Sequence, residues 1–238
     1  MRKALMLLPV LMVGGCHAAF GEESHERITR GFQVGGFEKI ALSGSGDVEV
    51  RTGAAASVRA EGDKEAIERL EIRVENGELR IGRRRDGDGW HFGWVRDRHL
   101  KIFVTVPSLS AASITGSGDV RIDKVAGNRF DGAISGSGDL GVGDMQVGEA
   151  SFSIAGSGDV RVAGKAGKAS LSTAGSGEIH AGGLETGSVN VSVMGSGDVR
   201  VRATQSADVN IMGSGDVHVA GTSNCKVHKA GSGDAQCG

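Results

Sequence analysis

The chain contains no tyrosine and only 2 proline and 2 tryptophan residues, and aromatic residues make up 4% of its 238 positions. A large globular core normally uses bulky aromatic side chains, so this core must be built from Val, Ile, Leu and Ala. Because proline is so scarce, the 41 glycines do not indicate a collagen-like chain. A hydrophobic content of 39% is ordinary for a folded chain and argues against disorder.

A strong charge of either sign is also missing. The formal net charge is −2, with 27 Lys and Arg residues against 29 Asp and Glu residues. This balance provides no whole-chain attraction to nucleic acid or to an anionic membrane surface. We therefore expect no nucleic-acid partner.

The only long hydrophobic run lies at the N-terminus. It covers residues 4–13, follows two basic residues, and is too short to span a bilayer but typical of a signal peptide. The segment Gly14-Gly15-Cys16 resembles the lipobox of bacterial lipoproteins, in which the cysteine is acylated and becomes the first residue. We predict a lipoprotein signal peptide over residues 1–15 and lipidation of Cys16.

The alternative is an ordinary signal peptide cut after Ala18 or Ala19, which would remove Cys16. His17 follows the cysteine where lipoproteins retained in the inner membrane typically have Asp, so the resemblance implies the outer membrane. Residues 16–35 are polar and contain glycine, and they are predicted to form a tether. The membrane, bound through the lipid anchor, is thus the first expected partner.

A Gly-Ser-Gly-acidic motif occurs eight times along the chain. From the second copy onward the steps are 20, 20, 19, 20, 18 and 18 residues, and such a nearly fixed period indicates a solenoid. The acidic residues of the eight copies are Asp47, Asp119, Asp139, Asp159, Glu178, Asp198, Asp216 and Asp234.

Between the motifs, apolar and polar residues alternate. In Val199-Arg200-Val201, for example, the period of two predicts a half-buried strand, and a looser turn is expected at residues 204–207. One coil cannot bury its own apolar face, but stacked coils can, with neighbouring strands paired in parallel. The predicted fold class is all-β, a single parallel β-solenoid.

Stacking would place identical residues of successive coils in ladders. We expect the motif serines to hydrogen-bond from coil to coil. Carboxylates about 5 Å apart repel one another, so the acidic ladder requires a partner. This partner is either the backbone of the residue's own turn, as in an Asx-turn, or a row of bound cations. The first is favoured because Asp is a common turn former.

The regular period fails between Asp47 and Asp119. Asn76-Gly77 lies between two alternating segments and predicts a β-hairpin. Asp63 is the predicted N-cap of a short helix that ends near Arg69. This part is expected to form an irregular N-terminal cap that covers exposed strand edges.

An insert at residues 83–99 contains both tryptophans, five arginines and two histidines. Aromatic rings beside arginine can bind a glycan, a phosphate group or a nucleic-acid strand. The alternative is a long loop whose tryptophans pack on the body of the protein. If the insert binds a ligand, Trp90, Trp94 and Arg96 are the expected contact residues.

Cys225 and Cys237 form an even pair in a chain predicted to be exported, which favours a disulfide. A metal site is less favoured, because His228 alone does not complete a ligand set. Catalysis needs one special constellation, whereas the carboxylates of this chain recur once per coil. We therefore expect no catalytic residues, no metal, no cofactor and no enzyme activity.

The repeat and its flanking segments resemble the bacterial DUF2807 family, the auto-transporter adhesin head GIN domain. The segments that carry the resemblance are 37–40, 43–48, 100–109 and the later motif copies from residue 116 onward. It covers about residues 35–238, so the domain is assigned to 36–238, and only the insert at 83–99 cannot be matched. The resemblance implies a right-handed β-helix in the cell envelope and transfers no catalytic residue.

Three functions remain open at this point. The leading one is a non-enzymatic envelope lipoprotein that acts as an adhesin or surface-binding module for a glycan or an envelope protein. The second is a structural or stress-related lipoprotein facing the periplasm. The third is a carbohydrate-active enzyme, because some β-helices carry such activities. The oligomeric state is left open.

Overall fold

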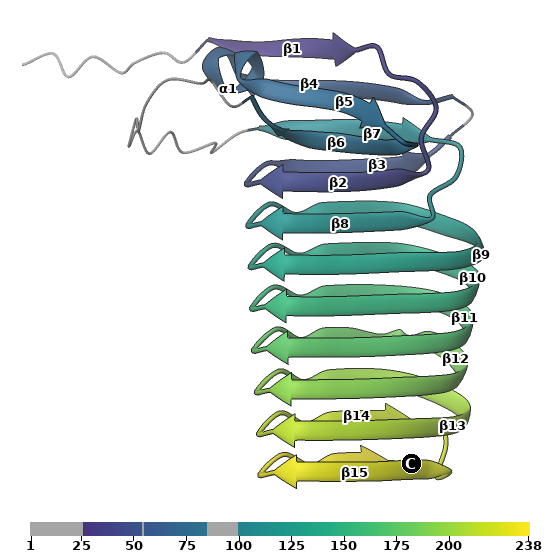
Figure 1. The fold of residues 1–238 in the computed structure, drawn as a ribbon. Helices are drawn as coiled ribbons and strands as arrows, with labels where there is room; N and C mark the ends of the chain where they lie inside the picture. The colour runs from purple at the N-terminus through teal and green to yellow at the C-terminus, as the bar shows by residue number, and fades with distance from the viewer. Residues whose placement is uncertain (1–25, 54, 85–99) are drawn as a thin grey trace, which may run out of the picture.

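The computed structural model describes residues 26–53, 55–84 and 100–238. Stacked parallel coils make up most of it, and strands dominate while helix is almost absent from these residues. The strands form one sixteen-stranded sheet that winds as a right-handed coil below an irregular cap (Figure 1). The predicted all-β solenoid with an N-terminal cap is therefore confirmed.

Each regular coil has two strand segments joined at a Gly-Ser-Gly-Asp corner. These strands are β2 (Lys39–Gly44), β3 (Asp47–Thr52), β8 (Ala111–Gly116), β9 (Val120–Gly136), β10 (Leu140–Gly156), β11 (Val160–Gly175), β12 (Ile179–Gly195), β13 (Val199–Gly213), β14 (Val217–Ala220), β15 (Cys225–Gly231) and β16 (Ala235–Cys237). The looser turn predicted at residues 204–207 corresponds to the second corner of this coil, because Arg202 pairs with β14 on one face and Ala207 with β15 on the other. The backbone nevertheless stays in the β13 ladder through this corner.

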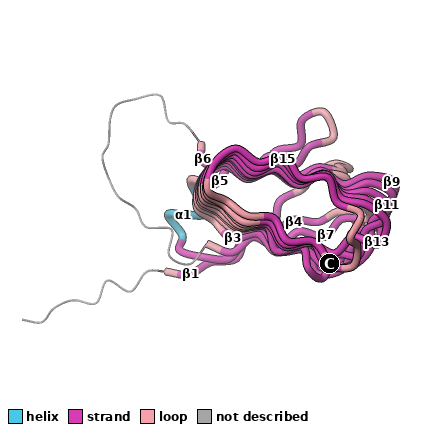
Figure 2. Tube along the Cα trace, turned by 90° about the horizontal axis from the view of Figure 1, so that it is seen from below, coloured by secondary structure: helices cyan, strands magenta, loops and turns pink. Residues whose placement is uncertain are grey.

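The long strands bend around the second corner of each coil. In β9, residues 120–122 pair with β3 on one side of the solenoid, whereas residues 131–136 pair with β8 on the other. A view along the stack shows the two long faces that result, with the core between them (Figure 2). Because the ladder continues through this corner, few backbone groups there lack a strand partner.

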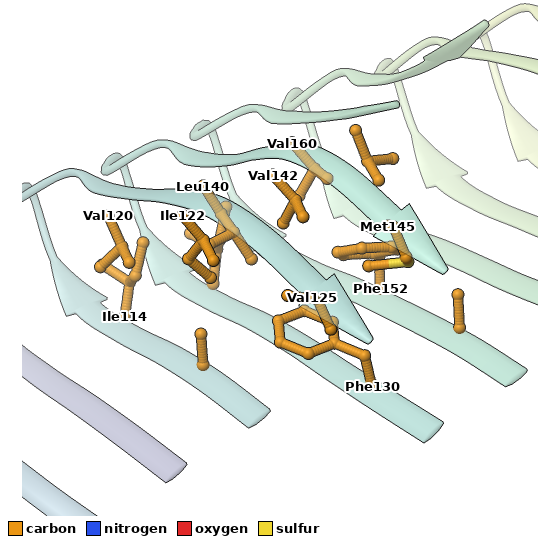
Figure 3. Close-up of a cluster of buried hydrophobic side chains, with 14 of the residues drawn as sticks. Ile114, Val120, Ile122, Val125, Phe130, Leu140, Val142, Met145, Phe152 and Val160 are labelled. Carbon is orange, nitrogen blue, oxygen red and sulfur yellow. The ribbon is translucent and has the colours of Figure 1, made fainter. Parts of the chain in front are cut away.

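The core is a stack of aliphatic ladders between the two faces. Val120, Leu140 and Val160 are in register and at most 1% exposed. Two phenylalanines replace part of the aliphatic stack, Phe130 and Phe152, with ring centroids 5.9 Å apart (Figure 3). The scarcity of aromatic residues thus corresponds to a thin core that Val, Ile and Leu fill.

Coils of 18, 19 and 20 residues stack without disturbing the motif corners. Register shifts take up the difference and lie between Val142 and Met145, between Arg161 and Ala163, between Ala181 and Glu185, and between Thr186 and Ser188. The first three follow the motif corner by a few residues, where an extra residue can be accommodated as a bulge. The corner residues therefore stay aligned from coil to coil.

The N-terminal cap contains the antiparallel part of the sheet. Its elements are β1 (Arg27–Phe32), β4 (Ser57–Asp63), α1 (Lys64–Glu68), β5 (Leu70–Glu75), β6 (Glu78–Arg83) and β7 (Lys101–Val106). β6 pairs in parallel with β2, and β7 pairs in parallel with β3, so both continue the stack. On their other edges, β6 pairs antiparallel with β5, and β7 pairs antiparallel with β4. The antiparallel strands cover edges that a solenoid end would otherwise expose.

The local predictions for the cap are confirmed in two places and wrong in one. Asn76 and Gly77 have φ values of 52° and 74° and join β5 to β6 as a hairpin. The short helix follows Asp63, although the Asp63 side chain forms no capping hydrogen bond. Residues 27–32, which were assigned to the tether, form β1 and pair with β4, because the edge of β4 needs a partner.

Candidate functional site

The motif corner is built mainly from backbone contacts between coils. At Gly156 φ is +140°, in the range that favours glycine. A Cβ atom at Gly158 would overlap the carbonyl oxygen of Gly138 in the preceding coil. The backbone N–H of Ser157 donates to the carbonyl oxygen of Gly136 at 2.9 Å. In the fully described stretch 100–238 the coils are thus linked at the serine positions by backbone bonds rather than by the predicted hydroxyl ladder.

The acidic residue of each motif bonds to the next coil. Oδ1 of Asp119 accepts the backbone N–H of Asp139 at 3.1 Å, and Oδ1 of Asp139 accepts that of Asp159 at 2.9 Å. Asp159 bonds in the same way to Glu178 at 3.1 Å. The favoured Asx-turn is therefore wrong for Asp119, Asp139 and Asp159, because the backbone donor belongs to the following coil.

Basic side chains two positions further along neutralise the ladder. Arg121 pairs with Asp119 at 3.0 Å, and Arg161 pairs with both Asp159 at 3.0 Å and Asp139 at 3.4 Å. Arginine and backbone N–H groups together relieve the repulsion between stacked carboxylates. The motif is thus used to hold the coils together, and a cation ladder remains only a prediction.

The ladder is interrupted at Glu178. Oε2 of Glu178 contacts His180 at 3.1 Å and Arg200 at 3.5 Å. Within residues 100–238, all of which the structure describes, no carboxylate accepts the backbone N–H of Asp198. The bond pattern resumes from Asp198 to Asp216 at 2.9 Å. The extra methylene of glutamate therefore costs the stack one hydrogen bond.

Replacing this glutamate should repair the ladder. We expect Glu178→Asp to raise the free energy of unfolding by about 1 kcal/mol, the usual net value of one hydrogen bond. The matched control is Asp159→Glu, which should lower it by a similar amount. Urea unfolding of the two variants measures both changes, and a loss of stability in Glu178→Asp would contradict the assigned role of the carboxylate.

Asp234, the last acidic residue of the eight motifs, lies in the last coil that the structure describes. The ammonium group of Lys229 donates to Oδ1 of Asp234 at 3.0 Å. This bond, followed by the backbone N–H of Ala235 and the positive charge of Lys229, holds the pKa of the Asp234 carboxyl below its ordinary value.

This pKa gives a pH-dependent prediction. A depressed folded-state pKa stabilises the fold at pH values above the unfolded pKa of about 3.9, and the contribution is lost as the pH falls through the folded pKa. We expect Lys229→Met to raise the pKa of Asp234, measured by carboxyl NMR titration. Lys226→Met is the control, because Lys226 makes no ion pair with the described residues. Equal shifts in both variants would show a general charge effect.

The insert leaves the solenoid at the position of a motif corner. β6 is in register with β2 up to Ile81, opposite Leu42, and β7 is in register with β3 from Lys101, opposite Asp47. β6 therefore ends, and β7 begins, at the level where the coil below has its motif corner. The predicted contact residues Trp90, Trp94 and Arg96 lie outside the described residues, as does Cys16.

A hollow of about 900 Å³ lies beside this corner, on the outer face of β5, β6 and β2. Its lining includes Arg73, Arg80, Arg83 and Arg84. Sequence analysis missed this group, although the Asn76-Gly77 hairpin register already places Arg73 opposite Arg80. The signal was present in the alternation of Glu and Arg along the two strands.

The predicted disulfide is present. Cys225 of β15 and Cys237 of β16 are bonded, with their Cα atoms 6.5 Å apart, and the bond connects the two faces of the last coil. No group of three or more His, Cys, Asp or Glu residues in the described part of the chain could hold a metal ion. Among the described residues there is also no helix with the length and apolar character needed to cross a membrane.

A family model described as "Putative auto-transporter adhesin, head GIN domain" matches residues 36–223. The chain belongs to this family. The head GIN match starts just before β2 and ends before Cys225, so it includes the insert but not the disulfide-bonded last coil. No curated protein sequence matches the chain significantly.

Several solved structures share this head GIN fold. One described as a putative adhesin from Bacteroides fragilis is 25% identical, with a TM-score of 0.80, covering 90% of this chain and 98% of that one. One described as a putative lipid binding protein from Parabacteroides distasonis is 28% identical, with a TM-score of 0.71, covering 90% and 97%. A third structure, described as a putative adhesin from Parabacteroides merdae, is 18% identical and supports the fold alone. Its TM-score is 0.71, and the match covers 90% of this chain and 97% of that one.

These descriptions name adhesins and a lipid-binding protein and not enzymes. They point to an adhesin-like protein of the cell envelope or cell surface. The family predicted from the repeat and its flanking segments is confirmed.

Proposed function

We propose that this head GIN protein is a non-enzymatic binding module of the outer cell envelope, anchored by lipid at Cys16 and acting as an adhesin. The observation that carries the proposal is the use of the motif carboxylates. They bond to backbone and arginine groups in coil after coil, which makes a rigid scaffold. A binding function then falls to the parts of the chain that break the repeat.

The insert at residues 83–99 is the main irregular part. Trp90, Trp94 and Arg96 are its proposed contact residues for a glycan or an envelope protein, on the usual enrichment of tryptophan and arginine in binding hot spots. The insert is flanked by β6, which pairs with β2, and by β7, which pairs with β3, and these strands offer a fixed base for presenting it.

Cell-surface exposure is the first test of this function. We would place a protease site within residues 83–99 and compare cleavage in intact and lysed cells. Cleavage in intact cells supports surface recognition. Protection until lysis favours instead the periplasm-facing structural lipoprotein and removes the adhesin role.

Membrane anchoring has a separate test. If Cys16 is lipidated, Cys16→Ser should move the protein from the membrane fraction to the soluble fraction. If the signal peptide is instead cut after Ala18 or Ala19, the substitution should leave the distribution unchanged. Saturable turnover of an envelope glycan by the purified protein would contradict the non-enzymatic assignment.

A further inference from the structure

Four arginines line the hollow at the cap, and three glutamates lie beside them. The hollow lies where the hairpin β5–β6 adjoins β2, on one long face of the solenoid. Further along the same face the outward residues next to the motif corners are small and uncharged, such as Ser113, Thr115 and Ser135. Charged residues of this face, such as Asp131 and Glu149, lie farther from the corners.

Two of the arginines face each other across the hairpin. Arg73 and Arg80 are directly opposite in the register of β5 and β6, an arrangement that is unfavourable for like charges. Glu75 bridges them, at 2.8 Å from Nε of Arg73 and 3.0 Å from Nη1 of Arg80. Each arginine also pairs with a second glutamate. Oε1 of Glu71 lies 2.6 Å from Nη1 of Arg73, and Oε1 of Glu78 lies 2.9 Å from Nε of Arg80.

These ion pairs fix the guanidinium groups but do not use all their donors. In both arginines the ion pairs involve Nε and Nη1, and a guanidinium carries five N–H donors. Each side chain is about half exposed, at 48% for Arg73 and 50% for Arg80. Arg83 and Arg84 also line the hollow, so four arginines and three glutamates surround it among the described residues.

The floor of the hollow is formed by residues with little or no side chain, Ser43, Gly44 and Gly82. The backbone does not require glycine at position 82. Its φ lies outside the left-handed range, and a Cβ atom there would approach no atom closer than 3.7 Å. A side chain at this position would fill the space in front of the arginines, so glycine keeps the hollow open.

We infer that this hollow binds a phosphate group, presented either by a lipid headgroup or by a soluble phosphate compound. Arginine forks match the oxygens of phosphate and form charge-assisted hydrogen bonds with them. The glutamates pre-orient Arg73 and Arg80, which lowers the entropy lost on binding. The inference deepens the proposed binding function by naming the chemistry of one ligand, and it rests on that function.

The test measures binding of two probes to the purified protein. The first probe is inorganic pyrophosphate, followed by calorimetry. The second is a vesicle of equal parts phosphatidylcholine and phosphatidylglycerol, compared with a vesicle of phosphatidylcholine alone. Binding to pyrophosphate alone identifies a soluble phosphate source, and binding to anionic vesicles that pyrophosphate displaces identifies a headgroup. Both results support the inference.

Two variants and one control locate the site. Arg73→Gln combined with Arg80→Gln should weaken binding roughly tenfold or more, the loss expected when about 1.4 kcal/mol of interaction is removed. Gly82→Val keeps every charge and fills the floor, and it should weaken binding to a similar extent. The control is Arg161→Gln with Arg200→Gln, which removes two similarly exposed arginines from the motif ladder. Circular dichroism checks that each variant is folded.

Three results would overturn the inference: no saturable binding of either probe, unchanged binding in Gly82→Val, or an equal loss in the ladder control. The last two would show a general effect of positive charge. Failure here leaves the surface-exposure test untouched, because cleavage of the insert in intact cells does not depend on phosphate. The two proposals can therefore fail separately.

Discussion

Gly158→Ala should destabilise the solenoid by about 3 kcal/mol, at the upper end of the usual cost of an overpacked contact. The added Cβ would overlap the carbonyl oxygen of Gly138 in the coil above. Backbone atoms cannot move aside by changing a rotamer, so the two coils must separate. Because each coil contacts only its neighbours, this separation weakens the stack at its middle.

Gly182→Ala is the matched control for this substitution. Gly182 also lies in a strand of the stack, but a Cβ atom there would meet nothing within 4 Å, and its φ is not left-handed. The control should therefore be neutral or gain about 0.5 kcal/mol from the lower entropy of the unfolded chain. Urea unfolding of both variants measures the difference. Similar losses in both would mean that the corner contact is not the cause.

The contrast between these two glycines shows what a sequence can predict about a solenoid. The period of 18–20 residues already identifies which residues are neighbours in adjacent coils, and so predicts the stack and its aliphatic core. It does not specify which atoms meet. Asp139 and Asp159 are correctly placed in one ladder by the period, but the bond from Oδ1 to the next backbone N–H depends on the offset between coils.

The cap was harder to predict because it does not repeat. The hairpin at Asn76-Gly77 is a local signal and is confirmed. The strand β1 has no such local signal, because its conformation depends on pairing with β4, which lies more than twenty residues away in sequence. Residues 27–32 have the polar, glycine-containing composition of a linker, and four of the six positions remain exposed while the other two are half-buried. Tertiary pairing decided the structure there.

The arginine hollow could have been deduced by combining two local signals. A two-residue Asn-Gly turn fixes the register of the hairpin, so the positions opposite each other follow by counting. This count places Arg73 opposite Arg80. The concave shape could not be deduced in this way, because it depends on Gly82 lying beside Ser43 of a strand almost forty residues earlier.

The disulfide should matter most in the last coil that the structure describes. In the last coil Val227 is 40% exposed, whereas Val209, its partner in β13, is fully buried. The last coil thus gains little from apolar burial. Cys225 and Cys237 stand opposite the buried Ala207 and Val219, so their bond joins the two faces where other coils use packed side chains.

We expect Cys225→Ala with Cys237→Ala to destabilise the last coil by about 3 kcal/mol, the loop-closure value for a short loop. The bond closes a loop of 12 residues in sequence separation, so the effect should remain local. Amide hydrogen exchange in β15 and β16 should accelerate by roughly 100-fold, because each 1.4 kcal/mol is a factor of ten. Exchange in β9 to β11 should not change, since those coils do not contact the last one.

Chemical reduction of the wild-type protein provides the control for lost side-chain packing. Reduction breaks the bond and keeps both sulfur atoms, so it should accelerate exchange in β15 and β16 to nearly the same extent as the alanine substitutions. Acceleration throughout β9 to β11 would contradict the nearest-neighbour account and would mean that the end coil supports the whole stack. Local acceleration would instead show that the disulfide stabilises the last described coil, as the antiparallel cap covers strand edges at the other end of the stack.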